Sequence, residues 1–491
     1  MNTRTFHRLA RASALAAVFA SASASDACAQ WSTMNLSANR QGLAATSVGD
    51  LAIFAGGLNN AGPSSRVDIY NTATDTWTTD ELSVARVYLA AASVGTKALF
   101  AGGGDNLAVN QSSVVDIYDN ATGQWTTANL AEPRSNLSAV TVGDKVLFAG
   151  GYWSDIVDIY DDSTQTWTTT NLSSVRAEMS ATVIGDKAYF AGGWDGSSVV
   201  DTVDVYDAAT GTWSLLTLPT GRNRMAAASI GNVALFAGGS INGPDSGVDI
   251  VSALDTTTDS WSNPTTIDPR EFFAATRVGN KVIFGGGFRT PQTIVDSVEI
   301  YDASTDTWST DNLSQARWGL AATTASNMAF FAGGRRNGGP SRRVDVYTDS
   351  IAVDVCAPAA MNSTGQPGVL EASGSATVSR QNLTLQASSL PLNQFGFFIV
   401  SMDEGFVQMP GGSQGDLCLG GAIGRYNMAG QILNSGATGS FQLTPDLGQT
   451  PTPSGLVPIL PNTTWVFQAW YRDQNPMQTS NFTQALSIGF N

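Results

Sequence analysis

The part of the sequence after residue 29 contains no histidine, and this restricts the chemistry that its side chains can perform. The one histidine of the chain is His7. Without an imidazole, the sequence excludes Ser-His-Asp hydrolysis, Cys-His catalysis and the usual zinc sites that contain histidine. Cys356 and Cys418 are the cysteines after residue 29, and an even number suits one disulfide in an oxidising compartment. We therefore predict a protein that uses no metal and no cofactor.

Arginines recur at a fixed distance from tryptophan. Seven similar phrases, such as "TWTTDELSVAR", place an arginine nine residues after a tryptophan. The arginines are Arg40, Arg86, Arg134, Arg176, Arg222, Arg270 and Arg317. Arginine pairs bidentately with carboxylates and is enriched at binding hot spots, so this set could line the mouth of a ligand site. A residue present in every repeat also fits a structural clamp between neighbouring repeats, which is the simpler interpretation.

Carboxylates recur in one register too, and we assign them to the geometry of the repeat. They are Asp68, Asp116, Asp158, Asp204, Glu299 and Asp345. Chemistry needs a residue once, whereas these recur in nearly every repeat. One repeat departs from the pattern, because Leu254 stands seven residues before Trp261, where other repeats have tyrosine, and the phrase "VDI" lies at 248–250. We expect a bulge or a longer loop there.

Two residues after each repeat arginine, the side chain changes from repeat to repeat. The seven residues are Gly42, Tyr88, Asn136, Glu178, Arg224, Phe272 and Gly319. Trp318 also lacks a counterpart in its own register. Such an uneven set suits one asymmetric ligand, or it reflects drift at a surface that contacts nothing. The candidates for acid–base chemistry without histidine are Glu178, Arg224, Glu271 and Tyr88.

The elements that must position these residues are short β-strands. From Trp31 to about Ser350 the sequence repeats with a period of 42 to 48 residues, and such periods indicate a repeat architecture. Each unit holds two β-prone runs joined by a Gly-Asp or Gly-Asn turn, then an alternating "VDIY" run, and then the tryptophan phrase. Four such strands cannot bury both faces alone, but sheets stacked radially can, as in a β-propeller.

The first tryptophan phrase, at 30–40, has no preceding strands of its own. Seven units carry a "FAGG"-type second strand, and the last unit ends at Tyr347 with no tryptophan phrase after it. We therefore predict that residues 31–36 supply the missing outer strand of the last unit. This pairing closes the ring and leaves no open sheet edge at the seam. The prediction is a seven-bladed propeller, an all-β fold, over residues 30–350.

These repeats resemble the kelch family, on the double glycine, the tyrosine seven residues before a tryptophan, and the arginine beyond it. The resemblance covers residues 30–350 and implies a propeller whose rim often holds partners. Galactose oxidase also carries kelch-type repeats, but its copper site needs histidine, so we exclude a copper oxidase. WD-repeat propellers need a Gly-His pair in each blade, which the sequence after residue 29 lacks.

The variable segments between the double glycine and the "VD" phrase would form this rim. The binding candidates are Trp153, Trp194, Trp318, Phe288, Arg289, Arg335, Arg336, Arg342 and Arg343. Our first hypothesis is a secreted protein that presents this rim to an extracellular protein or glycan. The alternative is a histidine-independent carbohydrate enzyme, an epimerase or lyase, at the propeller mouth. A structural extracellular scaffold is the third hypothesis.

Residues 351–491 lack the repeat and are predicted to form a β-sandwich. Short strand-like runs alternate there with Gly, Pro and Asn. Cys356 and Cys418 would join the entry segment to a strand and stabilise the module by about 3 to 4 kcal/mol. In "TWVFQAWYRD", one face carries Trp465, Phe467 and Tyr471. This face either packs in the core, the simpler reading, or forms an aromatic platform for sugar.

Residues 1–29 have the layout of a secretory signal peptide. Three arginines precede the apolar run "ASALAAVFASASA", and "ACA" precedes Gln30. A transmembrane anchor is the competing interpretation, but the run is too short to span a bilayer. Loss of the three arginines and Asp26 would take the net charge from −16 to −18, so we expect no binding to nucleic acid. We predict a secreted or periplasmic protein without a transmembrane segment after cleavage; the sequence predicts no oligomeric state.

Overall fold

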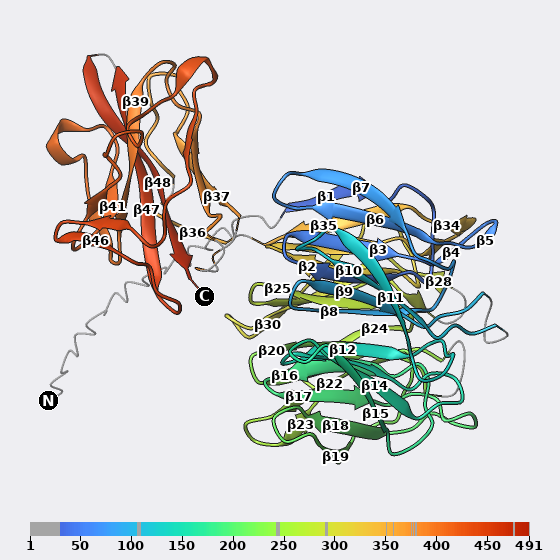
Figure 1. The fold of residues 1–491 in the computed structure, drawn as a ribbon. Helices are drawn as coiled ribbons and strands as arrows, with labels where there is room; N and C mark the ends of the chain where they lie inside the picture. The colour runs from blue at the N-terminus through green and yellow to red at the C-terminus, as the bar shows by residue number, and fades with distance from the viewer. Residues whose placement is uncertain are drawn as a thin grey trace, which may run out of the picture.

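The computed structural model describes residues 30–105, 110–241, 246–289, 293–349, 351–356, 358–374, 376, 378, 381–474 and 477–490. The predicted leader, residues 1–29, lies outside this part of the chain. The described residues form an all-β protein with short 3-10 turns at Pro410–Gly412 and Gly436–Thr438. Figure 1 shows the repeat region and a separate group of strands from the C-terminal part of the chain.

Residues 30–349 form seven antiparallel sheets of four or five strands, as far as the described residues show. The innermost strands are β2 (Ala44–Val48), β8 (Ala90–Val94), β12 (Ser138–Val142), β16 (Ser180–Ile184), β20 (Ala226–Ile230), β25 (Ala274–Val278) and β31 (Ala321–Ala325). The second strands are β3 (Leu51–Ala55), β9 (Lys97–Ala101), β13 (Lys145–Ala149), β17 (Lys187–Ala191), β21 (Val233–Ala237), β26 (Lys281–Gly285) and β32 (Met328–Ala332). Every second strand is almost wholly buried, which explains its continuous apolar sequence.

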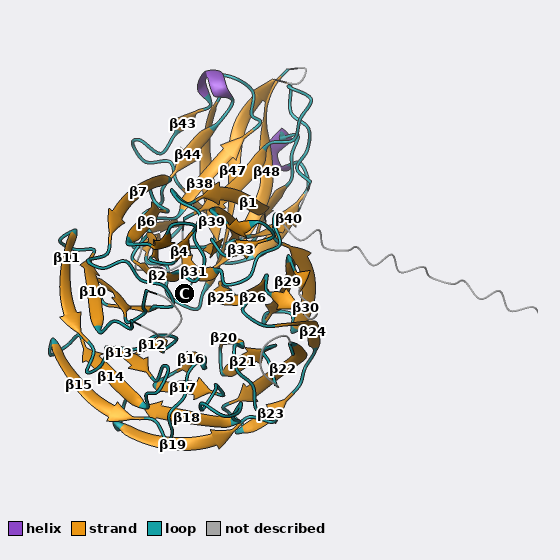
Figure 2. Cartoon of the chain, turned by 90° about the vertical axis from the view of Figure 1, so that its right-hand side faces the viewer, coloured by secondary structure: helices purple, strands orange, loops and turns teal. Residues whose placement is uncertain are grey.

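The remaining two strands of each sheet lie farther out (Figure 2). The third strands are β6 (Arg66–Asn71), β10 (Val114–Asp119), β14 (Ile156–Asp161), β18 (Thr202–Asp207), β22 (Val248–Asp255), β29 (Ser297–Asp302) and β35 (Arg343–Thr348). The outer strands are β7 (Thr76–Glu81), β11 (Gln124–Asn129), β15 (Thr166–Asn171), β19 (Thr212–Thr217), β23 (Ser260–Ser262), β30 (Thr307–Asn312) and β1 (Gln30–Asn35). A further strand, β24 (Thr266–Arg270), pairs with β22.

The connections between second and third strands carry small hairpins on one side of the ring of sheets. They are β4 (Leu58–Asn59) with β5 (Gly62–Pro63), β27 (Phe288–Arg289) with β28 (Thr293–Ile294), and β33 (Arg335–Arg336) with β34 (Gly339–Pro340). Innermost strands of neighbouring sheets contact each other, and β31 contacts β2 in the same way. Apolar side chains fill the space between sheets, as where the rings of Phe54 and Phe330 lie 6.1 Å apart.

The first strand of the chain lies in the same sheet as the last repeat. β1 pairs antiparallel with β35, and Trp31 lies opposite Tyr347 with their rings 5.2 Å apart. The Trp31 indole N–H donates to the carboxylate of Asp311 in the neighbouring sheet at 2.8 Å. Trp125 makes the equivalent bond to Asp80 at 2.8 Å. The N-terminal strand therefore makes the contacts of an ordinary outer strand.

The C-terminal part contains two larger sheets that share one core. The first contains β36 (Val353–Val355), β48 (Gln478–Gly489), β47 (Thr464–Gln474), β39 (Phe395–Ser401), β42 (Gly424–Arg425) and β43 (Leu433–Asn434). The second contains β37 (Val369–Ser373), β38 (Thr384–Ser388) and β44 (Phe441–Leu443). Two hairpins are added, β40 (Glu404–Val407) with β41 (Leu417–Leu419) and β45 (Thr450–Thr452) with β46 (Gly455–Val457).

The shared core explains the aromatic residues of β47. Trp465, Phe467 and Tyr471 are all buried in the cluster between the two sheets. Trp470 faces the other way and packs on Phe397, with their rings 4.9 Å apart. The face that we considered as a sugar platform is therefore part of the core. Cys356 and Cys418 form a disulfide, as predicted, with an S–S distance of 1.94 Å.

Candidate functional site

The seven repeat arginines lie next to the innermost strands, but their side chains are fully buried. The Arg40 guanidinium donates to the carbonyls of Gly56 at 2.8 Å and Arg66 at 2.6 Å, and it pairs with Asp68. The six acid pairs are Arg40–Asp68, Arg86–Asp116, Arg134–Asp158, Arg176–Asp204, Arg270–Glu299 and Arg317–Asp345. Each guanidinium therefore bonds to strands that follow it in the chain and does not face the mouth, where we expected it. Arg270 ends β24, which pairs with β22, and its partner Glu299 lies in β29 of the next sheet, so this pair also joins neighbouring sheets.

Backbone groups also make links between neighbouring sheets. The Gly57 amide donates to the Arg86 carbonyl of the next sheet at 2.8 Å. Gly56 has a φ of +68°, and a Cβ there would lie 2.8 Å from the same carbonyl, so the double glycine is needed for both conformation and space. The second oxygen of Asp68 accepts from the Ser37 amide of the preceding link at 2.8 Å. The arginine–carboxylate pair thus also fixes the crossing from one sheet to the next.

Arg222 has a hydroxyl where the other repeat arginines have a carboxylate. Its guanidinium donates to the Ser252 hydroxyl at 2.9 Å, and burial lowers the pKa of Arg222 to about 10. Leu254 lies opposite Trp261, so Ser252, and not Asp249, occupies the acid register. A shift in register between β22 and β24 lies at the start of β22, where we expected a bulge.

The seven variable residues two positions later form a ring that backbone hydrogen bonds hold together. The Tyr88 amide donates to the Gly42 carbonyl at 3.0 Å, and the Asn136 amide donates to the Tyr88 carbonyl at 3.1 Å. The Gly42 amide donates to the Gly319 carbonyl at 2.9 Å, between the first and last repeats. All seven have a φ of 55° to 60°, which is uncommon for residues other than glycine. The backbone therefore aims five unlike side chains at one place, while Gly42 and Gly319 leave room beside them.

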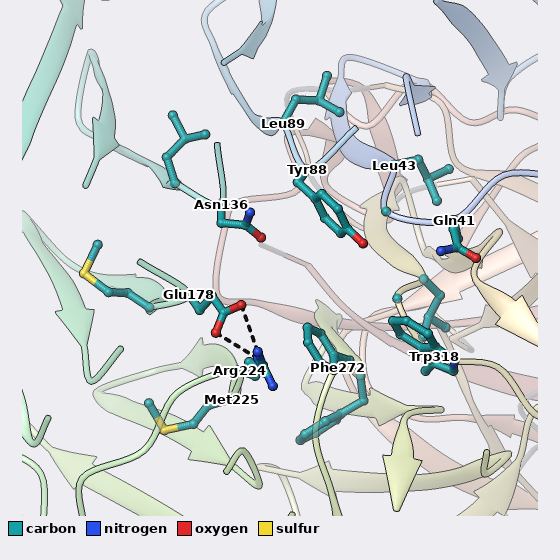
Figure 3. A pocket seen from close by; sticks show the side chains of 16 residues that line it. Gln41, Leu43, Tyr88, Leu89, Asn136, Glu178, Arg224, Met225, Phe272 and Trp318 are labelled. Atoms are coloured by element: carbon teal, nitrogen blue, oxygen red, sulfur yellow. Dashed lines mark hydrogen bonds and ion pairs between the residues drawn. The ribbon is translucent and has the colours of Figure 1, made fainter. Parts of the chain in front are cut away.

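These side chains line a solvent-open pocket of about 240 Å³, which we call the mouth pocket. Figure 3 shows its labelled residues around a common opening. The polar members are Gln41, Tyr88, Asn136, Glu178 and Arg224. The apolar members are Leu43, Leu89, Leu137, Met179, Met225, Phe272, Phe273, Trp318 and Leu320. A pocket with an apolar floor and a few convergent polar groups is the usual form of a ligand site.

Arg224 is held between two carboxylates in the mouth pocket. Its Nε donates to Glu178 at 2.8 Å and its Nη1 donates to Glu271 at 3.1 Å. The guanidinium carbon also lies 4.4 Å from the centre of the Phe272 ring, a cation–π geometry. Burial opposes the charge of Arg224, but the two carboxylates outweigh burial, and the pKa of Arg224 is raised. The guanidinium is therefore charged and fixed in orientation.

Glu178 is hydrogen-bonded through both of its oxygens. Tyr152 donates its hydroxyl to one oxygen at 2.9 Å, and Asn223 donates its side-chain amide to the other at 2.8 Å. Burial and, after it, the Glu178 charge raise the pKa of Tyr88 and Tyr152. Both phenols therefore stay protonated, and that of Tyr152 donates to Glu178. The side-chain nitrogen of Asn136 is buried without a hydrogen-bond partner in the described part of the chain.

The structure brings some of the predicted rim residues together at the mouth. The Trp318 ring lies 5.4 Å from that of Phe272 and 6.1 Å from that of Phe288. Arg335 donates to the Gln41 side chain at 3.2 Å. These contacts place one aromatic wall and one further cation beside the mouth pocket.

Trp153 and Trp194 line a second, smaller pocket beside the mouth. It has a volume of about 60 Å³, and we call it the tryptophan slot. Its lining residues are Tyr152, Trp153, Val175, Ala177, Trp194, Asp195 and Gly196. Tyr152 joins the two pockets, since it lines the slot and its hydroxyl donates to Glu178 in the mouth pocket.

The other rim candidates lie apart from both pockets. Arg289 and Arg336 are exposed on the hairpins β27–β28 and β33–β34, and Arg342 is exposed before β35. Arg343 belongs to β35 and donates to the Thr33 hydroxyl of β1 at 3.3 Å. We predicted that Arg343 faces a ligand at the rim, but the structure places it at the contact between β35 and β1.

Sequence reasoning missed Gln41, Asn223 and the role of the Tyr152 hydroxyl. A signal was present, because the residue directly after each repeat arginine and the residue directly after each double glycine also vary. Six of the seven such pairs are joined in the structure by a β-bridge, as for Ala177 with Trp194 and Glu271 with Phe288. In the remaining pair, the Tyr152 amide donates to the Ser135 carbonyl at 3.1 Å. Three variable registers therefore build the mouth, and we had singled out only one as a ring.

Two searches of the described residues found nothing. No cluster of three or more His, Cys, Asp or Glu side chains suited to a metal ion occurs among them. Nor does the described chain hold a helix that is long and apolar enough to cross a membrane.

Comparisons with known proteins identify part of the chain. Residues 89–268 match the family model of the KLHDC2/KLHL20/DRC7 Kelch-repeats domain, and residues 269–310 match that of the Kelch motif. No curated protein matches the chain. A solved structure titled "Structure of YjhT" is similar over 57% of this chain and 99% of its own, with 15% sequence identity and a TM-score of 0.47. Neither family model extends beyond residue 310.

Proposed function

Because this chain belongs to the kelch-repeat family, we propose that it is a secreted binding protein which presents the mouth of its β-propeller to an extracellular protein or glycan. Kelch repeats point to a role in protein interaction. The observation that carries the proposal is the mouth pocket, where residues from all seven sheets converge and where Tyr88, Asn136, Glu178, Arg224 and Phe272 each contribute a different chemical group.

We infer that the seven sheets are the blades of one propeller, closed by the N-terminal strand. The antiparallel pairing of β1 with β35 supports this inference, as does the contact between β31 and β2. The bond from Trp31 to Asp311, which matches that from Trp125 to Asp80, supports it further. A closed ring gives the mouth pocket a rigid wall on every side, and this rigidity lowers the entropy cost of binding.

Secretion is supported by the leader pattern at 1–29 and by the disulfide between Cys356 and Cys418, because disulfides persist in oxidising compartments. The C-terminal part is proposed as a β-sandwich module of residues 351–491, on the two sheets that share one core. The division of the chain at residue 350 stays a prediction.

The second candidate is a carbohydrate enzyme that works without histidine. Two carboxylates and an arginine converge at the mouth, Glu178 and Glu271 on either side of Arg224, and Tyr88 lines the same pocket. Such convergence is what an acid–base site requires. Binding is favoured, however, because both oxygens of Glu178 are already hydrogen-bonded within the protein. A general base needs a free oxygen within reach of the substrate proton.

The test is capture by the mature protein on a glycan array and in a pull-down from the native extracellular fraction. Alanine at Trp153, Trp194 or Arg336 should weaken capture without moving the thermal midpoint, because all three lie outside the core. Leu215→Ala is the control, since Leu215 is 60% exposed on the outer strand β19. Capture that persists in all three variants would show that the rim is not the binding surface.

The enzyme alternative has its own readout. The mature protein and its Glu178→Gln variant are incubated with sugars that bind on the array, and the products are followed by NMR. Turnover by the wild type that the variant loses would replace the binding proposal by the enzyme. Binding without turnover in either protein supports the binding proposal.

A further inference from the structure

The tryptophan slot has the properties of a site for one positively charged side chain. Trp153 is 74% exposed, which is unusual for the largest apolar side chain on a protein surface. Its backbone φ is +67°, a conformation that costs energy in any residue with a Cβ and that is concentrated at functional positions. An exposed tryptophan held in a strained backbone therefore indicates a binding contact.

The neighbouring loop supports Trp153 from below. A Cβ at Gly196 would lie 3.3 Å from the Trp153 ring, and Gly196 itself has a φ of +101°. The ring therefore rests on a glycine, which allows closer approach than any other residue would. Trp194 lines the same slot from the segment after β17. Two tryptophans from the connections of neighbouring sheets thus line one small space.

Asp195 supplies the only formal charge among the residues that line the slot. One of its oxygens accepts from the amides of Ser197 and Ser198, both at 2.7 Å, and from the Ser197 hydroxyl at 2.8 Å. These hydrogen bonds lower the pKa of Asp195, so it is ionised at neutral pH. The other oxygen has one long contact, with the Ser198 hydroxyl at 3.5 Å, and can accept a further donor.

Indole faces and a carboxylate are both attractive to a cation. We propose that the slot binds the side chain of a lysine on an exposed segment of a protein partner, with the ammonium group near Asp195 and the methylene stem on Trp153 and Trp194. The volume of about 60 Å³ accommodates an ammonium group and an adjoining methylene, since one water occupies about 30 Å³ of liquid. The net charge of −16 also favours a basic partner through long-range attraction.

This inference rests on the proposed function, because it names the partner chemistry at one edge of the same mouth. Tyr152 makes the connection, since it lines the slot and its hydroxyl donates to Glu178 in the mouth pocket. We therefore expect a partner held by a lysine in the slot to lie at the edge of the mouth pocket.

The test uses the mature full chain and three capped peptides, acetyl-Gly-Xaa-Gly-amide, in which Xaa is lysine, norleucine or arginine. Saturation-transfer NMR reports which peptide protons contact the protein, even at millimolar affinity. The lysine peptide should bind with its outer methylene protons closest to the protein, and about tenfold more tightly than the norleucine peptide, because the cation contributes to binding. Equal binding of lysine and norleucine peptides would overturn the proposal, as would tighter binding of the arginine peptide.

Variants of the slot make the test specific. Asp195→Asn keeps the oxygen that accepts from the Ser197 and Ser198 amides, so the loop should keep its shape, but it should weaken lysine-peptide binding about threefold or more through loss of the charge. Trp153→Ala should abolish the signal, and Leu215→Ala should leave it unchanged. An unchanged signal in both slot variants would overturn the proposal.

The outcome separates this inference from the proposed function. If the lysine peptide does not bind but the protein still captures a partner or glycan through its rim, the slot inference is wrong and the proposed function stands. If the lysine peptide binds and no capture occurs in the pull-down or on the array, the proposed function is wrong while the slot remains a cation site.

Discussion

Two registers of the repeat lie only two residues apart and differ in nearly every physical respect. The repeat arginines are identical in all seven repeats, buried, and hydrogen-bonded to strands that follow them in the chain. The residues of the mouth ring differ in every sheet but two, are partly exposed, and face a common pocket. At the arginine position the side chain makes the structural contacts. At the ring position the backbone makes them, through hydrogen bonds between neighbouring repeats.

The difference separates stability from specificity within one short segment. A side chain that carries structural contacts cannot vary, because an unpaired buried charge is strongly destabilising. A side chain whose backbone is held independently can vary without unfolding the protein. The comparison predicts that substitutions at the first register change stability and that substitutions at the second change mainly binding.

The largest expected effect follows from removing the N-terminal strand. Deletion of residues 30–40 removes β1 and Arg40, leaving β35 with an unpaired edge and Asp68 without its guanidinium. Loss of a buried partner alone costs about 3 to 5 kcal/mol, so the thermal midpoint should fall by about 10 °C or more. Differential scanning calorimetry measures it. An unchanged midpoint would refute the closure of the ring.

The next largest effect should come from neutralising one buried carboxylate. Asp158→Asn leaves the Arg134 guanidinium buried without its counter-charge, at a cost of about 3 to 5 kcal/mol. Asp201→Asn is the matched control, since Asp201 is exposed. Chemical denaturation of both variants compares the free energies of unfolding. If Asp158→Asn costs no more than the control, the arginine pairs are not what holds each sheet together.

Replacing a carboxylate by an amide in the mouth pocket should lower the free energy of unfolding less than Asp158→Asn does, and it should change ligand affinity more. Glu178→Gln replaces one acceptor of the Arg224 Nε by a group that can rotate, at a site open to water, so we expect a loss of about 1 to 2 kcal/mol. The pocket also gains one unit of positive charge, and capture of the native ligand should change at least about tenfold. Titration with the captured ligand measures this. A variant as unstable as Asp158→Asn, with normal binding, would break the comparison between the two registers.

The smallest expected effect is a gain. Ser252→Asp gives Arg222 the carboxylate that the other repeat arginines have, and compensation of a buried charge should add about 1 to 2 kcal/mol, or about 2 to 4 °C in the thermal midpoint. Ser252→Asn is the matched control, since it has the same shape without the charge. A midpoint for Ser252→Asp below that of Ser252→Asn would show that this sheet has adapted to the hydroxyl.

The regular parts of the fold could be predicted from the sequence because they repeat. Seven strand sets and the position of the N-terminal phrase follow from counting, and Trp31 pairs with Tyr347 as expected. The sequence also predicts that the seven variable residues meet at one place. They occupy the same position in each repeat, and equivalent positions in radially stacked sheets lie at the same distance from the centre. The disulfide followed from the even number of cysteines.

The contacts between registers could not be predicted in this way. Arg134 and Asp158 are 24 residues apart, and their pairing depends on the direction of both side chains, which the repeat does not encode. The spacing of the repeat also predicted no partner for Arg222. In this repeat the "VDI" phrase lies before Ser252, which occupies the position of the carboxylate in the other repeats. The bond from Tyr152 to Glu178 joins two sheets, so no single repeat contains it.

The seven residues around the mouth, which all have a positive φ, affect how the sequence of such a protein can change. Hydrogen bonds between adjacent repeats fix the main chain at these seven positions. Single substitutions can therefore change the side chain at each position without changing the backbone. Each repeat then contributes one position that can be varied independently. A library randomised at the seven ring positions alone would sample new binding specificities on the same scaffold. The natural sequence, with phenol, amide, carboxylate, guanidinium and phenyl groups in turn, is one member of that library.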